Sequence, residues 1–205
     1  MSNRMDNLFG SETRRTLLTA LLMNQDSSYH IRELSEVTGV PYGMVYKEVQ
    51  NLTKMGIIIN KKKGSLNILH VNKNLPIYPD LRNIIIKTTG FYKHLTKELN
   101  SEFDYLLIYG STASHKDRPK GDIDLMVIGE IDENHLLDSI NRVETQTKRV
   151  IDYIHWTLDG FYEKIKERNH LLLDIVEKPI IMLEGNEHEF RRIVREKIDR
   201  ENQNR

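Results

Sequence analysis

Two short motifs bring together residue types that could bind a phosphorylated ligand. Gly110 and Ser111 follow the apolar run 105–109. Such a pair lets the backbone approach a phosphate while helix-terminal N–H groups and the serine hydroxyl donate hydrogen bonds to it. Asp122 and Asp124 begin a second apolar run, eleven residues after Ser111, and the two-residue period of a strand places both carboxylates on one face. The sequence therefore predicts an anion-binding turn beside a carboxylate pair.

The paired carboxylates predict a bound cation. Like charges this close raise each other's pKa or require a compensating cation, and hard divalent cations prefer oxygen ligands. Asp152 adds a third carboxylate inside the apolar run 150–156, where an acid is a poor choice for an ordinary buried strand. Three acids from neighbouring strands could hold two Mg²⁺ ions, which activate an attacking hydroxyl and neutralise a departing pyrophosphate. We therefore expect Asp122, Asp124 and Asp152 to be both metal ligands and catalytic residues.

Each motif also has an ordinary explanation. A Gly-Ser pair alone is a common turn, and an Asp-x-Asp alone is more often an exposed strand start than a metal site. Their order, their strand context and the third acid favour the functional interpretation.

The elements that must position these residues alternate between strands and helices. Apolar runs predict three strands, over residues 105–109, 125–128 and 150–156. The polar stretch 134–148 predicts a helix between the last two strands, 180–183 a further strand, and 187–205 a charged helix. This alternation indicates an α/β domain with a mixed sheet.

The first part of the chain has a different pattern, three helices followed by a β-hairpin. Apolar residues recur at helical spacing within 11–23 and 31–37, and Pro41 opens a third helix that Gly56 ends. Two β-rich runs then flank a basic, glycine-containing tip, with strands at 57–60 and 66–71 and the tip at 61–65. This is the order of elements in a winged helix-turn-helix.

Residues 11–75 resemble the winged-helix transcription regulators of archaea and bacteria, most clearly over IRELSEVTGVPYGMVYKEVQNLTKMGII. The resemblance implies that the third helix enters the major groove of double-stranded DNA while the hairpin lysines hold phosphates. The spacing of Val45, Val49, Leu52 and Met55 predicts one buried stripe on that helix. The expected DNA-binding residues are Tyr42, Tyr46, Lys47, Gln50, Lys54, Lys61, Lys62 and Lys63. The ordinary alternative is a solvated helix face and a solvated hairpin tip.

The second part of the chain resembles nucleotidyltransferases of the DNA polymerase beta superfamily. The resemblance rests on GS, the eleven-residue gap, DID with its hydrophobic strand, and the later lone Asp in RVIDYIHW. It is closest to the minimal nucleotidyltransferases, some of which are antitoxin partners of small helical toxins. The resemblance implies that Gly110 and Ser111 hold a triphosphate, that Asp122 and Asp124 bind both Mg²⁺ ions, and that Asp152 helps to deprotonate the acceptor.

The chain departs from this family pattern after the Gly-Ser pair. Many minimal members continue with a small residue, arginine and glycine, whereas here the small residue is followed by Ser114 and His115. A positive charge facing the phosphates is then either missing or supplied by His115, Lys116, Arg118 or Lys120. We expect Ser114 and Lys120 to join Gly110 and Ser111 in binding the nucleotide.

Composition narrows the class of protein. The formal net charge is zero, but residues 1–90 contain 12 Lys and Arg against 7 Asp and Glu, and residues 91–205 contain 18 against 23, so the halves carry +5 and −5. A basic half suits phosphate contacts and an acidic half suits a cation site. The absence of cysteine excludes disulfides, thiolate nucleophiles and Cys-ligated zinc, and it suits the cytoplasm. No signal-peptide or bilayer-spanning apolar run occurs, so we expect no membrane association.

We therefore expect an α+β protein with three parts: a winged helix-turn-helix domain over 1–78, a linker helix region over 79–100 and a nucleotidyltransferase domain over 101–205. The expected function is transfer of a nucleoside monophosphate from a nucleoside triphosphate (NTP) to a hydroxyl of a protein or RNA, by a DNA-bound homodimer with two Mg²⁺. Two alternatives stay open. One is a transcription regulator whose transferase domain senses nucleotide with little or no catalysis, and the other is an antitoxin-like partner of a small helical toxin.

Overall fold

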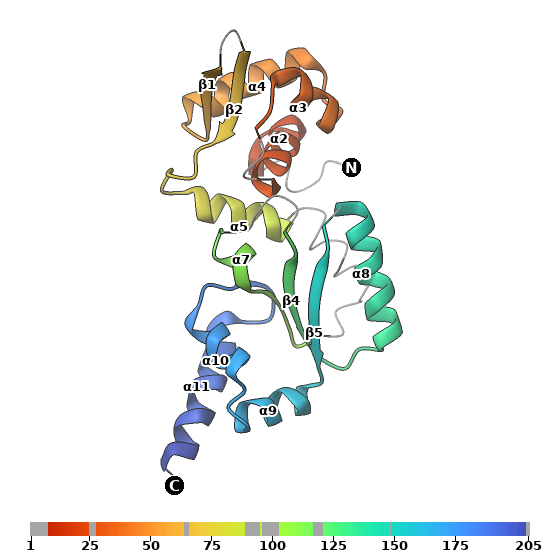
Figure 1. Cartoon of the computed structure of the whole chain (residues 1–205), viewed down its shortest axis with the longest axis vertical. Coiled ribbons are helices and arrows are strands. Elements are labelled where there is room, and N and C mark those ends of the chain that lie inside the picture. The colour runs from red at the N-terminus through yellow and green to blue at the C-terminus, as the bar shows by residue number, and fades with distance from the viewer. Residues whose placement is uncertain are drawn as a thin grey trace. The chain divides into compact units, whose positions relative to one another are not determined.

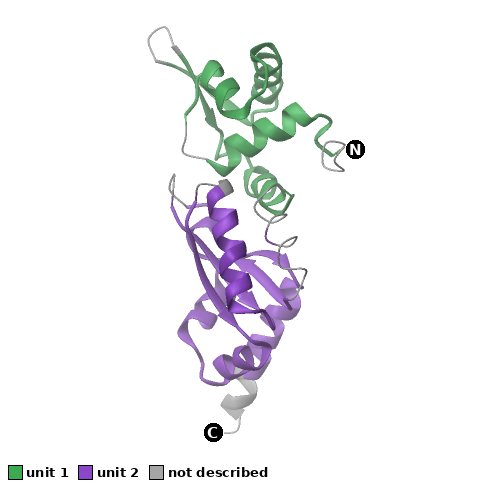
Figure 2. Ribbon diagram, turned by 90° about the vertical axis from the view of Figure 1, so that its right-hand side faces the viewer, with its two compact units in different colours: residues 1–89 green, residues 90–205 purple. Residues whose placement is uncertain are grey.

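The chain forms two compact units, Met1–Thr89 and Gly90–Arg205 (Figures 1 and 2). The computed structural model describes residues 8–24, 28–63, 66–88, 95, 103–116, 121–147 and 149–203. Within these residues no helix is both long and apolar enough to cross a membrane.

The first unit contains helices and one hairpin in the predicted order. Its elements are α2 (Glu12–Met23), α3 (Ile31–Thr38), α4 (Tyr42–Lys54), β1 (Ile58–Lys63), β2 (Leu66–Val71) and α5 (Tyr78–Thr88). Helix α2 begins at Ser11, whose hydroxyl accepts a hydrogen bond from the Arg14 N–H at 3.1 Å. Helix α3 ends at Gly39, whose φ of 68° is the left-handed conformation that glycine adopts most easily.

The core of this unit is built from one face of each helix and from the hairpin. Val45, Val49 and Leu52 of α4 are buried as predicted. Met55 is not: its side chain is 54% exposed, because α4 ends at Lys54 and Met55 is the C-cap residue where the chain leaves the helix. Ile57, two residues later, enters the core instead.

Helix α5 packs in the first unit, where the sequence pattern suggested a linker. Tyr78 and Ile85 belong to the same hydrophobic core as α2 to α4. Arg82 is fully buried and donates a hydrogen bond from Nε to the carbonyl of Leu22 in α2 at 3.1 Å. A side chain this hydrophilic is buried only where its donors find acceptors, so Arg82 ties α5 firmly to α2.

The hairpin is longer than predicted. Strands β1 and β2 are antiparallel from Ile58↔Val71 to Lys63↔Leu66, so Lys61, Lys62 and Lys63 lie in a strand and not in the turn. Their backbones complete the hydrogen-bond ladder with β2. The side chains of Lys61 and Lys62 are exposed to solvent, so placing them in a strand costs little free energy. A third segment joins the ribbon, because the backbones of Tyr29 and Leu69 exchange two hydrogen bonds of 3.1 and 2.9 Å.

An ion pair between a partly exposed arginine and a buried carboxylate connects α2 to α4. Glu48 is 7% exposed, and its carboxylate accepts from Arg14 Nε at 2.5 Å and from the Asn51 amide at 3.0 Å. Helix α4 therefore has a fixed rotation about its axis, with Tyr42 and Tyr46 left on the outside at 50% and 49% exposure.

The second unit is a mixed four-stranded sheet with helices on both faces. Its elements are β3 (Tyr105–Ile108), α7 (Gly110–Ala113), β4 (Ile123–Ile128), α8 (Glu133–Thr147), β5 (Ile151–Trp156), α9 (Leu158–Lys166), α10 (His170–Glu177), β6 (Ile181–Glu184) and α11 (Glu187–Gln203). The strand order is β5-β4-β3-β6. Strand β3 is antiparallel to both of its neighbours, whereas β4 and β5 are parallel. The predicted α/β core with a mixed sheet is thus confirmed.

The two faces of this sheet are buried by different helices. On one face Leu107, Met126 and Ile128 pack with side chains of α9, α10 and α11, such as Phe161 and Phe190. Helix α8 lies on the other side of the sheet (Figure 1), where it contributes buried Leu136, Ile140 and Val143. Because strand side chains alternate between faces, Asp124 shares the α9–α11 face with Met126, at the end of the strand where the apolar packing stops.

Candidate functional site

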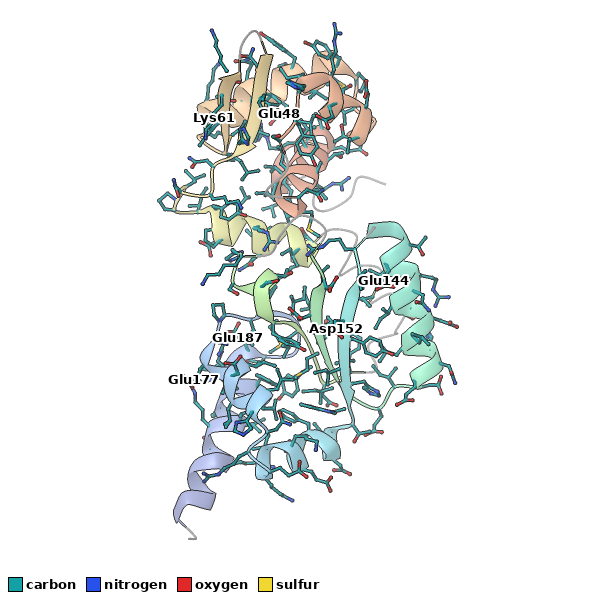
Figure 3. All side chains as sticks on the ribbon, viewed as in Figure 1. Glu48, Lys61, Glu144, Asp152, Glu177 and Glu187 are labelled. Atoms are coloured by element: carbon teal, nitrogen blue, oxygen red, sulfur yellow. The ribbon has the colours of Figure 1, made fainter. Side chains whose placement is uncertain are left out.

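Parallel pairing of β4 and β5 brings two of the three predicted acids together. Asp124 and Asp152 are direct partners in the register, so their side chains leave the same face of adjacent strands. Asp152 is exposed and lies on β5 (Figure 3), and Asp124 is half-buried. Asp122 is exposed and precedes β4. The start of β5 is fixed from α8, where the Glu144 carboxylate accepts from the Ile151 N–H at 2.6 Å.

The Gly-Ser turn packs directly against Asp124. Gly110 has a φ of +67°, and a Cβ placed on it would lie 2.1 Å from Asp124 Oδ2. Only glycine fits here, both for its backbone conformation and for its lack of a side chain. The Ser111 backbone N–H donates to the Asp124 carboxylate, and the Tyr109 N–H donates to the Asp124 carbonyl at 3.0 Å. The predicted anion-binding turn therefore contacts the predicted carboxylate pair.

Arg149 holds the two motifs in place, and nothing in the sequence pattern singled it out. This side chain is 7% exposed. It donates to the Gly121 carbonyl from Nε at 3.1 Å and from Nη2 at 2.7 Å, and Nη2 also contacts the Thr112 hydroxyl at 3.5 Å. Arg149 thus links α7 to the residue before Asp122 and to the start of β5. An arginine two residues before an apolar strand was the only available signal, and it is a weak one.

The electrostatics of the site reflect its crowding. Burial raises the pKa of Asp124, and the nearby charges of Asp152 and Asp122 raise it further, while the Ser111 N–H acts in the opposite direction. Burial and the charges of Asp124 and Asp152 raise the pKa of Tyr109 to about 12. The charges of Asp122, Asp124 and Asp152 make the electrostatic potential of the site negative, and a bound cation would reduce their repulsion.

A cleft of about 600 Å³ opens beside Asp124. One side consists of the turn and its neighbours: Tyr109, Gly110, Ser111, Ser114, Lys116 and Asp124. The other side belongs to α10 and the residues after it: Leu171, Asp174, Ile175, Lys178 and Pro179. The sequence analysis named no residue of this second group, and it assigned no element to residues 157–179.

The remaining predicted nucleotide-binding residues divide into two groups. Ser114 lines the cleft and donates from its hydroxyl to the Gly110 carbonyl. Lys116 is an exposed cation on the cleft wall. Lys120 and Arg118 lie outside the described residues. Four residues after the Gly-Ser pair were considered as sources of a positive charge facing the phosphates. Of these, Lys116 is the one that the structure describes on the cleft lining.

The donor set fits a hard divalent ion of the Mg²⁺ type. Among the described residues no three Asp, Glu or His side chains are placed to hold one metal ion by themselves. Mg²⁺ seldom needs such a cage, since it is usually bound by one or two carboxylates together with substrate phosphates and water. The in-register pair Asp124 and Asp152 next to a cleft satisfies that requirement.

The predicted DNA-binding residues lie on two elements of the first unit. Tyr42 and Tyr46 are stacked on the exposed side of α4, with ring centroids 6.4 Å apart. Exposed polar side chains follow on α4 and on β1: Lys47, Gln50, Lys54, Lys61 and Lys62. Lys63 is the last residue of β1.

Comparison with known proteins identifies no family. No protein-family model matches the chain, and a search of curated proteins found no match. Among solved structures, the chain is similar to one in "Crystal structure of the toxin-antitoxin with AMP-PNP", with 12% identity, 55% of this chain and 86% of that chain covered, and a TM-score of 0.40. It is also similar to one in a crystal structure of a mutant toxin-antitoxin MntA-HpeT, with 11% identity, coverages of 56% and 89%, and a TM-score of 0.40. We draw no functional conclusion from likenesses of this extent.

Replacing Gly110 with alanine should destabilise the second unit by about 1–3 kcal/mol, since it adds strain at a positive φ and a clash with Asp124. The measurement is the free energy of unfolding in urea. Gly43→Ala is the control: Gly43 is the second residue of α4 and has nothing within 4 Å of its added Cβ, so the change should alter stability by less than about 0.5 kcal/mol. Equal effects of the two substitutions would contradict the packing described for Gly110.

Replacing Asp124 with asparagine should stabilise the fold at neutral pH. The raised pKa of Asp124 means that ionisation costs the folded state more than the unfolded chain, and this cost is present at pH 7 and absent below the ordinary value of 3.8. The gain in free energy of unfolding should therefore shrink as the pH falls toward 3.8. Asp138→Asn, at an exposed position on α8, should change stability by less than about 0.5 kcal/mol. A less stable Asp124→Asn protein at pH 7 would refute the interpretation.

Proposed function

We propose that the second unit binds an NTP with Mg²⁺ and transfers its nucleoside monophosphate to a hydroxyl of a protein or RNA. One observation carries the proposal: Asp124, in register with Asp152 on a parallel strand, lies directly against Gly110 and lines a cleft. A carboxylate pair beside backbone donors and a cavity is what metal-assisted phosphoryl chemistry requires of a protein.

Each group has a role in this proposal. The Gly110–Ser111 turn and Lys116 bind the phosphates, and Asp124 and Asp152, with Asp122 close by, hold Mg²⁺. Bound Mg²⁺ would neutralise charge on the phosphates and on the leaving pyrophosphate. Asp152 is exposed, so it can take the proton of the acceptor hydroxyl as that oxygen bonds to the α-phosphorus and the bond to pyrophosphate breaks. Arg149 contributes by keeping the turn and Gly121 at a fixed separation.

The cleft is large enough for such a substrate. Ligand pockets for small molecules and cofactors have volumes of roughly 300–1,000 Å³, and this one is about 600 Å³. Its lining changes from polar on the turn side to largely apolar on α10, which suits a ligand with a charged end and an aromatic end.

For the first unit we propose binding to double-stranded DNA in the manner of a winged helix. Three observations support this: the exposed tyrosine pair at the start of α4, the lysines of β1, and the bridge that adds Tyr29 to the hairpin. The ion pair from Arg14 of α2 to the buried Glu48 of α4 fixes which side of α4 faces outward. Residues 1–90 also carry a formal charge of +5, which suits contact with phosphates.

A second candidate function is DNA binding controlled by a nucleotide that is bound but not transferred. It is favoured by the finding that, among the described residues, no three Asp, Glu or His side chains are placed to hold one metal ion, because metal-assisted transfer asks more of the carboxylates than nucleotide binding does. In that case nucleotide would alter DNA affinity equally in the wild type and in an Asp152→Asn variant, whereas neither protein would release pyrophosphate.

The transferase proposal predicts that Asp124→Asn and Asp152→Asn each lower the rate of nucleoside monophosphate transfer by at least about a hundredfold, because they remove charge that stabilises the transition state. The assay incubates the full chain with NTP radiolabelled at the α-phosphate, Mg²⁺ and cell extract and follows labelled acceptor bands. Asp138→Asn should retain wild-type labelling. Labelling that persists in both active-site variants would place the chemistry elsewhere.

The DNA-binding proposal predicts that the double substitution Lys61→Ala, Lys62→Ala weakens affinity for all duplexes. It should also make the slope of log affinity against log salt concentration shallower by up to about two, one for each lysine that neutralises a phosphate. The measurement is fluorescence anisotropy over a range of salt concentrations. Gln50→Ala should leave that slope unchanged and alter sequence preference instead. A control change in the second unit, Lys164→Ala on α9, should affect neither quantity. An unchanged slope in the double variant would argue against hairpin contacts.

A further inference from the structure

The α10 side of the cleft has no role in the chemistry proposed above. Leu171, Ile175 and Pro179 give it an apolar surface. Asp174 and Lys178, one helical turn apart, add a carboxylate and an ammonium group whose atoms lie 2.6 Å apart. An apolar surface next to a paired acceptor and donor can hold an aromatic ring and recognise its polar edge.

The ion pair contributes little to the fold. Its side chains are 53% and 62% exposed, and exposed pairs of this kind stabilise a protein weakly. The pair lies on one wall of the cleft, and the Gly110–Ser111 turn lies on the opposite side. We therefore look for a role of the pair in ligand binding and not in stability.

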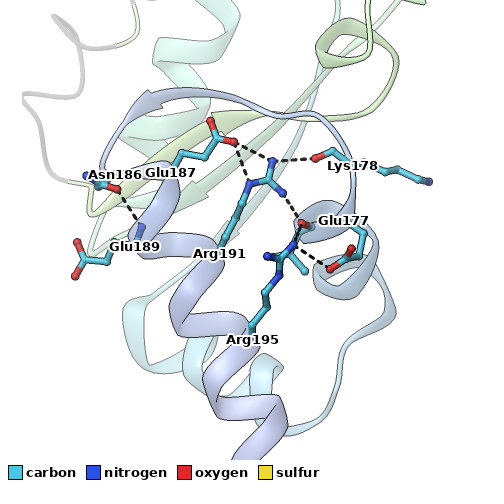
Figure 4. Close-up of polar contacts among 8 residues, drawn as sticks. Glu177, Lys178, Asn186, Glu187, Glu189, Arg191 and Arg195 are labelled. Atoms are coloured by element: carbon cyan, nitrogen blue, oxygen red, sulfur yellow. Dashed lines mark hydrogen bonds and ion pairs between the residues drawn. The ribbon is translucent and has the colours of Figure 1, made fainter.

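The position of this wall is fixed from behind by α11 (Figure 4). Arg191 donates to the backbone carbonyls of Val176 and Lys178, the latter at 2.9 Å, and Arg195 donates to the Val176 carbonyl at 3.3 Å. Both arginines carry positive charge to the C-terminal end of α10, where the helix dipole favours it. Arg191 and Arg195 are further held by Glu187 and Glu177 at 2.9 and 3.2 Å. The wall is thus set in place before any ligand binds.

We propose that α10 selects the nucleobase of the bound NTP: the base packs on Leu171, Ile175 and Pro179, and its edge meets Asp174 and Lys178. This inference rests on the proposed function of the second unit, and it deepens it by naming a substrate preference. A carboxylate only accepts hydrogen bonds and an ammonium group only donates them. Guanine presents two neighbouring donors, N1–H and the N2 amino group, beside the O6 acceptor, so a carboxylate can accept from both donors while an ammonium group donates to O6. Adenine, cytosine and uracil each offer a carboxylate one donor on the corresponding edge. The pair therefore favours guanine.

The test measures binding of the full chain to four NTP analogues with a non-hydrolysable α–β linkage and to inorganic tripolyphosphate, all with Mg²⁺, by calorimetry. The guanosine analogue should bind at least about tenfold more tightly than each of the other three, the size of one hydrogen bond to a charged group. The double variant Asp174→Ala, Lys178→Ala should abolish that difference and leave tripolyphosphate affinity unchanged. Asp174→Asn should narrow it, because a carboxamide keeps one acceptor oxygen and places an NH₂ donor opposite the second guanine donor.

The matched control is Lys164→Ala, Glu167→Ala on α9, which removes another exposed ion pair of similar length, 2.7 Å, away from the cleft lining. It should preserve the full difference between bases. Base preferences that are the same in the wild type and in both α10 variants, with tripolyphosphate still bound, would overturn this inference and leave the proposed function standing. Failure of the wild type to bind tripolyphosphate or any analogue would overturn the proposed function and this inference with it.

Discussion

The site depends on one constraint, the parallel pairing of β4 and β5. Parallel strands in register place like residues side by side, and here those residues are Asp124 and Asp152. The pairing requires a crossover, which α8 provides, and it requires the start of β5 to be fixed, which Glu144 and Arg149 achieve by hydrogen bonds to the backbone. Burial of Asp124, to which the charges of Asp152 and Asp122 add, costs the fold stability when this carboxyl ionises, as its raised pKa indicates. The fold thus concentrates negative charge at the point where a cleft begins.

The two units manage charge in different ways. In the first, Arg14 neutralises the buried Glu48, so that α4 keeps a fixed face toward solvent. In the second, the described neighbours of Asp124 include two more acids and a tyrosine whose pKa is raised to about 12. The carboxylate of Glu48 is thus paired with a cation of the protein itself, whereas the half-buried Asp124 lies beside further acids on the lining of a cleft.

Sequence patterns predicted the elements well and their edges less well. Apolar runs identified β3 and β4, because a strand buried on both faces has little freedom in composition. The edge strand β5 was also predicted, although all of its residues except Ile151 are at least partly exposed. Periodicity placed Met55 in the core, but the helix ended one residue sooner and exposed it. The hairpin lysines looked like a turn because polar composition does not reveal backbone pairing. Arg149 and α10 could not be predicted, since their importance comes from contacts between segments distant along the chain.

The way α11 holds α10 bears on how this protein could diversify. Arg191 and Arg195 donate hydrogen bonds to the backbone carbonyls of Val176 and Lys178. These bonds do not depend on side-chain type, because every residue has a backbone carbonyl. Exposed side chains of α10 on the cleft lining, such as Asp174, can then be exchanged while the helix remains where it is. Variation of the cleft lining at such positions is therefore compatible with an unchanged architecture.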